Sequence, residues 1–106
     1  MIHVVAIITA KPGKRAEVLE FVMHNVRAVR DEDGCVEYTP MVDQDSSAAK
    51  LGEDVVLIVE KWRDEAALEA HRTAPHMRSY IAKTKDLIAD RRVHVLRAAL
   101  PGDCRG

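Results

Sequence analysis

The residues best suited to chemistry are concentrated between residues 55 and 80. This stretch holds the only tryptophan of the chain, Trp62, together with His71, His76 and Tyr80. An imidazole with a reference pKa of about 6.5 is suited to act as a general base at neutral pH. Because these side chains come from short elements that meet at two corners, the sequence predicts a small pocket here, with a histidine as its candidate base.

Each of these residues also has a purely structural interpretation. Trp62 stands at the end of a strand, where a tryptophan is often simply the largest core residue. His71 falls on the buried side of a short helix and could be a core histidine that links two elements. The positive end of a helix would favour the neutral form of His76, although a solvated residue at a helix terminus explains it equally well.

The sequence predicts no metal site. His71 and His76 are five residues apart with Pro75 between them, and this spacing does not place two imidazoles on one helical face. Cys35 and Cys104 lack C-x-x-C spacing, so neither a structural disulfide nor a zinc site is expected.

Hydrophobic periodicity predicts the elements that position these residues. Pro12-Gly13 and Asp33-Gly34 mark turns, Asp64 stands where a helix N-cap belongs, and Pro75 suits the first turn of a further helix. The expected strands are Ile2–Ala10, Cys35–Val42, Val55–Trp62 and Arg92–Ala98; the expected helices are Lys14–Arg30, Asp64–Arg72 and Pro75–Ala89. The polar segment 43–54 is expected to be a mobile connection. This order predicts an α+β, ferredoxin-like βαββαβ fold with an antiparallel four-stranded sheet and its helices on one face.

Composition narrows the class of protein. The 106 residues fit one domain, expected over residues 1–100, followed by a flexible tail over 101–106. Sixteen basic and seventeen acidic residues without long runs argue against nucleic acid or an anionic membrane as the main partner. No apolar run approaches the ~20 residues of a membrane span, and no signal-peptide pattern is present at the N-terminus. A cytoplasmic location is therefore expected.

The strands predict a homodimer. Val4 and Ile8 point to one side of the first strand and Val5 and Ile7 to the other, and Val55–Val59 is also apolar on both sides. A sheet with one solvated face should alternate apolar and polar residues. We therefore expect the second face to pack against the sheet of another subunit around a two-fold axis.

Three motifs, in this order, resemble the antibiotic biosynthesis monooxygenase domain family, and within it the bacterial quinol monooxygenases. They are Gly34-Cys35-x-x-Tyr38-x-Pro40-Met41-Val42-Asp43, Glu60-x-Trp62, and Leu68-Glu69-Ala70-His71-x-x-x-Pro75-His76-Met77. The resemblance covers Ile2 to about Leu100. It implies a dimeric α/β barrel with a pocket between sheet and helices, in which a small hydroxylated aromatic substrate reacts with dioxygen without a metal, flavin or haem cofactor.

The resemblance also implies roles for individual residues. His71 or His76 would be the catalytic base, Trp62 a flat wall of the pocket, and Tyr38 and Tyr80 hydrogen-bonding or stacking neighbours of the substrate. Met41 and Met77, which are also typical core residues, complete the expected substrate-binding set.

Two branches of the family differ from this chain. The polyketide-tailoring branch has an asparagine and an arginine where this chain has Ile58 and Ala82. The haem-degrading branch has a histidine at the position of Ile81 and an asparagine on the first strand, which is absent here. Haem cleavage is therefore disfavoured. A non-catalytic dimer that binds a small aromatic ligand, and a scaffold module, remain as alternatives to the enzyme.

Overall fold

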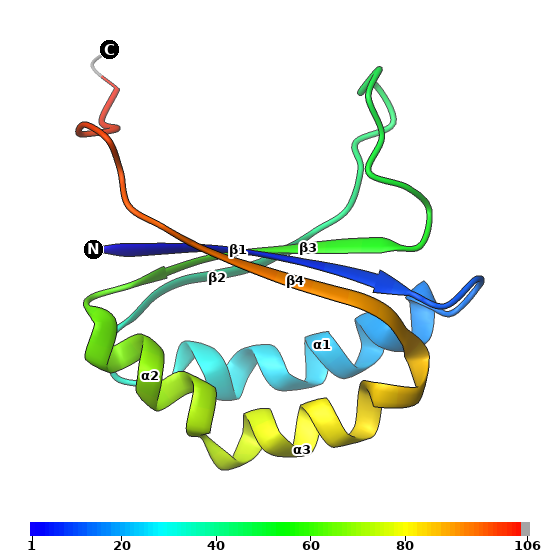
Figure 1. Ribbon diagram of the computed structural model, residues 1–106, viewed down its shortest axis with the longest axis horizontal. Helices are drawn as coiled ribbons and strands as arrows, with labels where there is room; N and C mark the ends of the chain where they lie inside the picture. The colour runs from blue at the N-terminus through cyan, green and yellow to red at the C-terminus, as the bar shows by residue number, and fades with distance from the viewer. Residues whose placement is uncertain (105–106) are drawn as a thin grey trace.

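The structure, a computed structural model that describes residues 1–104, has two layers: a four-stranded sheet and three helices that cover one of its faces (Figure 1). The elements are β1 (Ile2–Ala10), α1 (Arg15–Arg30), β2 (Cys35–Met41), β3 (Val55–Trp62), α2 (Glu65–Thr73), α3 (Pro75–Thr84), the 3₁₀ turn η1 (Lys85–Leu87) and β4 (Ile88–Leu96). All strand pairs are antiparallel and the strand order is β2-β3-β1-β4. The predicted ferredoxin-like α+β fold is confirmed.

The boundary between the last helix and the last strand lies closer to the N-terminus than predicted. The helix expected to run to Ala89 ends at Thr84, and β4 begins at Ile88 instead of Arg92. The cause is pairing with β1, because Ile88 lies opposite Ala10 and the Lys11 amide donates to the Leu87 carbonyl at 2.8 Å. Ladder hydrogen bonds override local helix propensity here, and no Gly or Pro marks the boundary in the sequence.

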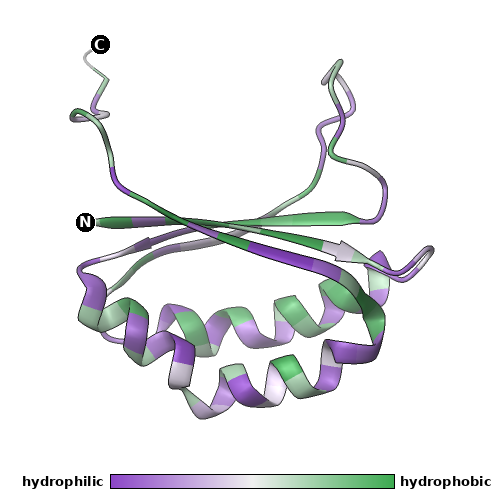
Figure 2. Ribbon diagram, in the orientation of Figure 1, coloured by the Kyte–Doolittle hydropathy of each residue, from purple (hydrophilic) through white to green (hydrophobic). Residues whose placement is uncertain are grey.

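The core lies between the sheet and the helices. Strand alternation turns Val4, Ala6 and Ile8 of β1 towards the helices, and each is at most 6% exposed. α1 contributes buried valines that are spaced three or four residues apart: Val18, Val22, Val26 and Val29. Figure 2 shows hydrophobic residues along both β1 and β3.

The other face of the sheet carries no helix (Figure 1). Val5 and Ile7 of β1 lie opposite Val59 and Leu57 of β3, so apolar side chains continue across this face, all of them half-buried. The connection between β2 and β3 and the segment after β4 both project to this side (Figure 1).

Three remaining expectations concern the chain as a whole. No helix within residues 1–104 is long and apolar enough to cross a membrane. Residues 101–104 form neither helix nor strand, whereas 105 and 106, the end of the expected tail, lie outside the described residues. The mobility expected for segment 43–54 stays a prediction.

Candidate active site

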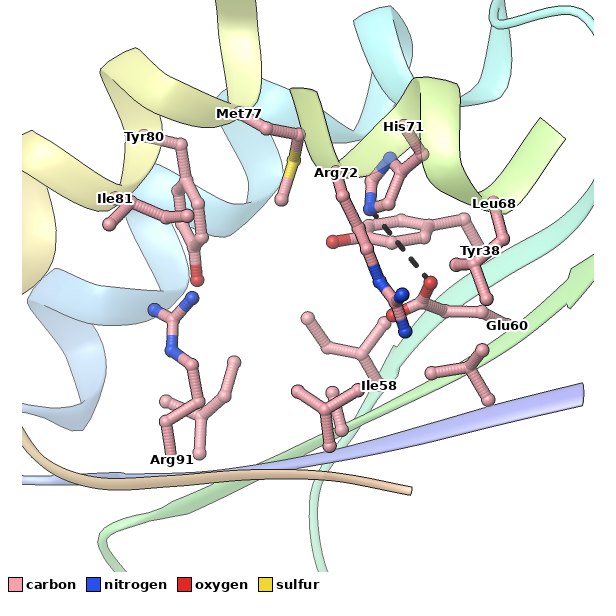
Figure 3. Close-up of a pocket in the computed structure, with 14 residues that line it drawn as sticks. Tyr38, Ile58, Glu60, Leu68, His71, Arg72, Met77, Tyr80, Ile81 and Arg91 are labelled. Atoms are coloured by element: carbon pink, nitrogen blue, oxygen red, sulfur yellow. Dashed lines mark ion pairs between the residues drawn. The ribbon is translucent and has the colours of Figure 1, made fainter. Parts of the chain in front are cut away.

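A cavity of about 360 Å³ lies between the sheet and the pair α2–α3 (Figure 3). Its volume is within the usual range for small-molecule sites. Most of its lining is apolar: Val4, Ala6, Ile8, Ile58, Leu68, Met77, Ile81 and Val93. Six residues bring polar groups to it: Tyr38, Glu60, His71, Arg72, Tyr80 and Arg91.

α2 holds His71 above this cavity. Asp64 is the N-cap of this helix, because its carboxylate accepts a hydrogen bond from the Ala67 amide at 2.8 Å. Gly34 lets the helix approach the start of β2, since a Cβ at this position would lie 2.5 Å from the Cβ of Ala67. Gly34 also has a φ of +85°, a conformation that glycine adopts without strain.

His71 and His76 converge on one carboxylate. His71 Nδ1 and His76 Nε2 each lie 2.8 Å from Oε2 of Glu32, in the turn after α1. When Glu32 is ionised it only accepts hydrogen bonds, and the two ring nitrogens that face it then carry the protons. In neutral His71 the unprotonated nitrogen is then Nε2, which points towards the cavity and lies 3.9 Å from Oε1 of Glu60.

Glu60 is a carboxylate in the floor of the cavity. It is 5% exposed, and burial raises its pKa above the ordinary value, while a hydrogen bond from Trp62 partly offsets this. That bond runs from Trp62 Nε1 to Oε1 of Glu60 at 2.9 Å. A proton placed between Glu60 and His71 Nε2 would therefore be shared by two groups that both face the cavity.

Trp62 lies behind His71 and does not line the cavity. It is fully buried, and its ring centroid is 4.5 Å from that of His71 with the ring planes inclined by 34°. The expectation that Trp62 forms a flat wall of the pocket therefore differs from its position in the structure. Because Trp62 is the last residue of β3, it lies under α2, and its contacts support His71 and Glu60 from behind.

Three other predicted residues line the cavity: Tyr38, Met77 and Tyr80. The Tyr38 ring centroid is 5.8 Å from that of His71, and burial raises the pKa of Tyr38 so far that its hydroxyl stays protonated. Met77 receives a contact of 3.2 Å from the Asn25 amide nitrogen to its sulfur. The Tyr80 hydroxyl is buried and has no hydrogen-bond partner among residues 1–104.

Two predicted residues lie outside the cavity. Met41 pairs with Leu57 on the helix-free face of the sheet and is 43% exposed, because it lies three positions from Tyr38 and strand alternation turns it the other way. His76 lies on the far side of Glu32 from the cavity, with its side chain 28% exposed.

His71 and His76 lie on two different helices, so they share no helical face, yet their rings meet. The chain bends at Ala74-Pro75 between α2 and α3, so both rings reach the same carboxylate. The ligand atoms of Glu32, His71 and His76 all lie within 4.8 Å of one another, and these residue types could hold a divalent cation. Two hydrogen bonds of 2.8 Å already account for the arrangement.

Sequence reasoning missed four polar groups of this site. The sequence did contain a signal for Glu60, since it is the one acidic residue of β3 and shares a face with the apolar residues Ile58 and Trp62. Glu32 had none, because it lies in a turn 39 residues from His71. Arg72 and Arg91 gave no signal either, as each looks like an ordinary surface arginine.

Known proteins place this chain in a family. A sequence model of the family described as Antibiotic biosynthesis monooxygenase matches residues 1–83. The Escherichia coli (strain K12) protein named "Probable quinol monooxygenase YgiN" is 32% identical over 104 residues, which cover 94% of this chain and all of the relative. The YcnE protein of Bacillus subtilis (strain 168) is 34% identical over 90 residues, or 84% of this chain and 87% of its own length.

Solved structures share the fold. PA3566 from Pseudomonas aeruginosa superimposes with a TM-score of 0.79 at 27% identity and covers 92% of this chain and 94% of its own. Rv0793 from Mycobacterium tuberculosis, at 24% identity, has a TM-score of 0.81 over 96% of this chain and 98% of its own, and supports the fold alone. With the family match over most of its length, the chain belongs to the antibiotic biosynthesis monooxygenase family.

Proposed function

We propose that this protein is a cofactor-independent monooxygenase that oxidises a quinol or a similar dihydroxyaromatic with dioxygen, acting as a cytoplasmic homodimer. The observation that carries the proposal is the position of His71 Nε2, which faces a mostly apolar cavity while Nδ1 is held by Glu32. The name of the Escherichia coli relative supports the same substrate class.

The first step is removal of a phenolic proton by His71. Glu32 fixes the tautomer in which Nε2 is free to accept that proton, and the resulting imidazolium lies between Glu32 and Glu60. Two carboxylates beside a new positive charge stabilise it in a site with little water. His71 therefore has the geometry of a general base, which His76, outside the cavity, lacks.

The quinol itself supplies the electrons for the remaining steps. The phenolate gives one electron to dioxygen, and the semiquinone and superoxide combine to form a C–O bond. The proton held on His71 then goes to the peroxide. Loss of water from the ring hydroperoxide leaves a hydroxylated quinone, so one oxygen atom enters the ring and the other leaves as water. The apolar walls exclude bulk water from the radical pair.

The proposed dimer uses the helix-free face of the sheet. Val5, Ile7, Leu57 and Val59 form a continuous apolar band there, and Met41 extends it onto β2. An unpartnered apolar sheet face of this kind is typical of a subunit interface. A second copy, packed sheet against sheet, is the occupant that the strand pattern favours.

Oxygen consumption with 1,4-dihydroxynaphthalene, measured in chelator-treated protein, tests the proposal. We expect substrate-dependent uptake above the autoxidation rate, and a loss of about 10²–10⁴-fold in His71→Ala, the usual range for a positioned general base. His76→Ala should retain most of the rate. If His76→Ala abolishes uptake and His71→Ala does not, the base has been assigned wrongly.

Binding measurements complete the test. His71→Ala should still bind 1,4-naphthoquinone, because the apolar walls remain. If the wild type binds it saturably but consumes no oxygen above background, the protein is a ligand-binding member of the family without the oxygenation step. Ile58, which lines the cavity where the polyketide-tailoring branch has asparagine, is compatible with that outcome.

A further inference from the structure

Two hydrogen-bond donors meet at the end of the cavity away from His71. Tyr80 reaches it from α3 and Arg91 from β4, and Figure 3 shows the Tyr80 hydroxyl pointing towards the Arg91 guanidinium. The guanidinium carbon lies 5.5 Å from the Tyr80 ring centroid. The Tyr80 hydroxyl oxygen can accept a hydrogen bond from Arg91, but its own proton has no acceptor among residues 1–104, since a guanidinium only donates. Arg91 is half-buried and takes part in no ion pair in this part of the chain.

Arg72, the other arginine of the cavity, is different. It lies beside Glu69, with Nη1 3.4 Å from Oε2, and its side chain is 48% exposed. A neighbouring carboxylate and solvent therefore satisfy its charge. The contrast leaves the Tyr80 proton and the N–H groups of Arg91 as the donors that face the cavity without a carboxylate partner among residues 1–104.

The two ends of the cavity are chemically opposite. His71 Nε2 and Glu60 can accept a proton at one end, whereas Tyr80 and Arg91 can donate hydrogen bonds at the other. Ile58 and Met77 supply apolar surface between them (Figure 3). Burial raises the pKa of Tyr80, with partial compensation by the charge of the nearby Arg91 and by a hydrogen bond from it, so the Tyr80 hydroxyl keeps the proton that it donates.

We propose that Tyr80 and Arg91 form an oxygen-binding subsite that accepts the second oxygen of the aromatic ligand as a carbonyl or oxyanion. This inference rests on the proposed function for the first oxygen, which lies at His71. The ligand class is a flat ring system with a hydroxyl at one end and an acceptor oxygen at the opposite end. A catechol, whose two oxygens are adjacent, cannot fill both ends.

The subsite also acts during the reaction. When the hydroxylated product forms, its second oxygen passes its proton by tautomerisation to the oxygen that entered the ring and becomes a carbonyl, which is a better acceptor for Tyr80 and Arg91. Donors placed in advance at an atom that gains acceptor strength stabilise the later states more than the starting quinol. Tyr80 and Arg91 therefore contribute to both ligand selection and rate.

Anaerobic binding of two stable ligands tests the subsite without turnover. 4-Hydroxy-1-naphthaldehyde carries a hydroxyl and an opposite carbonyl, while 1-naphthol has the hydroxyl alone. The ratio of their dissociation constants reports on the second oxygen, and comparing the ratio between variants removes the contribution of the more acidic hydroxyl of the aldehyde. We expect the wild type to bind the aldehyde at least about tenfold more tightly than 1-naphthol, since 1-naphthol leaves the buried Tyr80 hydroxyl without an acceptor.

Three variants make the test specific. Tyr80→Phe keeps the ring and Arg91→Met keeps an apolar stem, and each should bring the ratio close to one without changing the affinity for 1-naphthol. Arg92→Met is the matched control, because Arg92 lies on the helix-free face opposite Ile7 and pairs with Asp90 at 3.1 Å. It should keep the wild-type ratio.

The results separate this inference from the proposed function. A wild-type ratio near one, or an unchanged ratio in both Tyr80→Phe and Arg91→Met, would overturn the subsite whether or not the protein consumes oxygen. If the ratio is high in the wild type and close to one in both variants but no oxygen is consumed, the subsite is supported and the proposed oxygenation step is contradicted. Unchanged binding of 1-naphthol shows that each variant has kept its cavity.

Discussion

His71 is bracketed by carboxylates that reach it from different parts of the chain. Glu32 contacts Nδ1 from the turn after α1, and Glu60 faces Nε2 from β3. His71 is therefore placed like a general base, with Glu32 orienting the ring on one side and Glu60 stabilising its charged form on the other. Of the two acids, Glu60 is the more buried, so its ionised form bears the larger desolvation penalty.

Glu60→Gln should stabilise the protein at neutral pH. Burial raises the folded pKa of Glu60 above its ordinary value of 4.5, so the folded state holds this proton to higher pH than the unfolded chain. The stability that the neutral form contributes is present below 4.5 and is lost as pH rises through the folded pKa. Glutamine stays neutral and still accepts from Trp62 Nε1, so it escapes this loss.

Urea denaturation of both proteins across a pH series measures the effect. The difference in free energy of unfolding, variant minus wild type, should grow from mild acid towards neutral pH and then level. Trp62→Phe is a useful comparison, because it removes the hydrogen bond that favours the ionised Glu60 and should enlarge the pH-dependent loss. A difference that is constant across the series would show that Glu60 does not titrate differently in the folded state.

At the scale of elements, the corner formed by α2 and α3 creates the site. Asp64 begins α2, Ala74-Pro75 separates it from α3, and the two helices present His71 and His76 to one side chain. The position of α2 depends in turn on its contact with Gly34 at the start of β2. Any change that lifts α2 should therefore displace His71 from Glu60.

Gly34→Ala should destabilise the protein through both backbone and packing. A left-handed non-glycine residue costs about 1–2 kcal/mol, and the new Cβ would meet Ala67 Cβ at 2.5 Å, an overlap that commonly adds about 1–3 kcal/mol. Gly13→Ala is the control, since Gly13 has a φ of +77° but nothing within 4 Å of a new Cβ.

Chemical denaturation gives the two free energies, and oxygen uptake reports on the site. We expect Gly34→Ala to lose more stability than Gly13→Ala and also to lose activity. Equal losses in the two variants would mean that the Gly34–Ala67 contact is not what holds α2 in place.

At the scale of the whole molecule, the sheet has one covered face and one bare face. The cavity lies on the helix side of the sheet, and Val5 and Val59 of the apolar band do not line it. The β2–β3 connection and the segment after β4 project beyond this bare face (Figure 1), where a second subunit would meet them.

Val5→Lys should dissociate the proposed dimer. Val5 is half-buried at the middle of the bare face, opposite Val59, and a lysine in each of two packed sheets would bury charges near the two-fold axis. The control is Met23→Lys, which adds the same charge at a residue of α1 that is 66% exposed. Sedimentation equilibrium at micromolar concentration should show a dimer for the wild type and the control. A monomeric wild type would end the dimer proposal.

The order of elements and the region of the chain that contributes His71, Met77 and Tyr80 to the cavity could be predicted from sequence because both depend on local signals. Alternation along β1 and β3, the valine spacing of α1, the Asp64 cap and Pro75 all act over a few residues. The same alternation already separates Met41 from Tyr38, so the placement of Met41 in the pocket was an error of interpretation. The motifs around Trp62 and His71 indicated the family without reference to any contact.

The contacts that give the site its chemistry come from tertiary structure alone. Glu32 lies 39 residues from His71 and 44 from His76, and no local pattern links a turn after one helix to two later helices. The start of β4 likewise depends on its pairing with β1. The contact between Tyr80 and Arg91 depends on that pairing and on the packing of α3 against the sheet. The physical reason is that local propensity decides which elements form, whereas the packing of those elements decides which polar groups share a cavity and which titrate together.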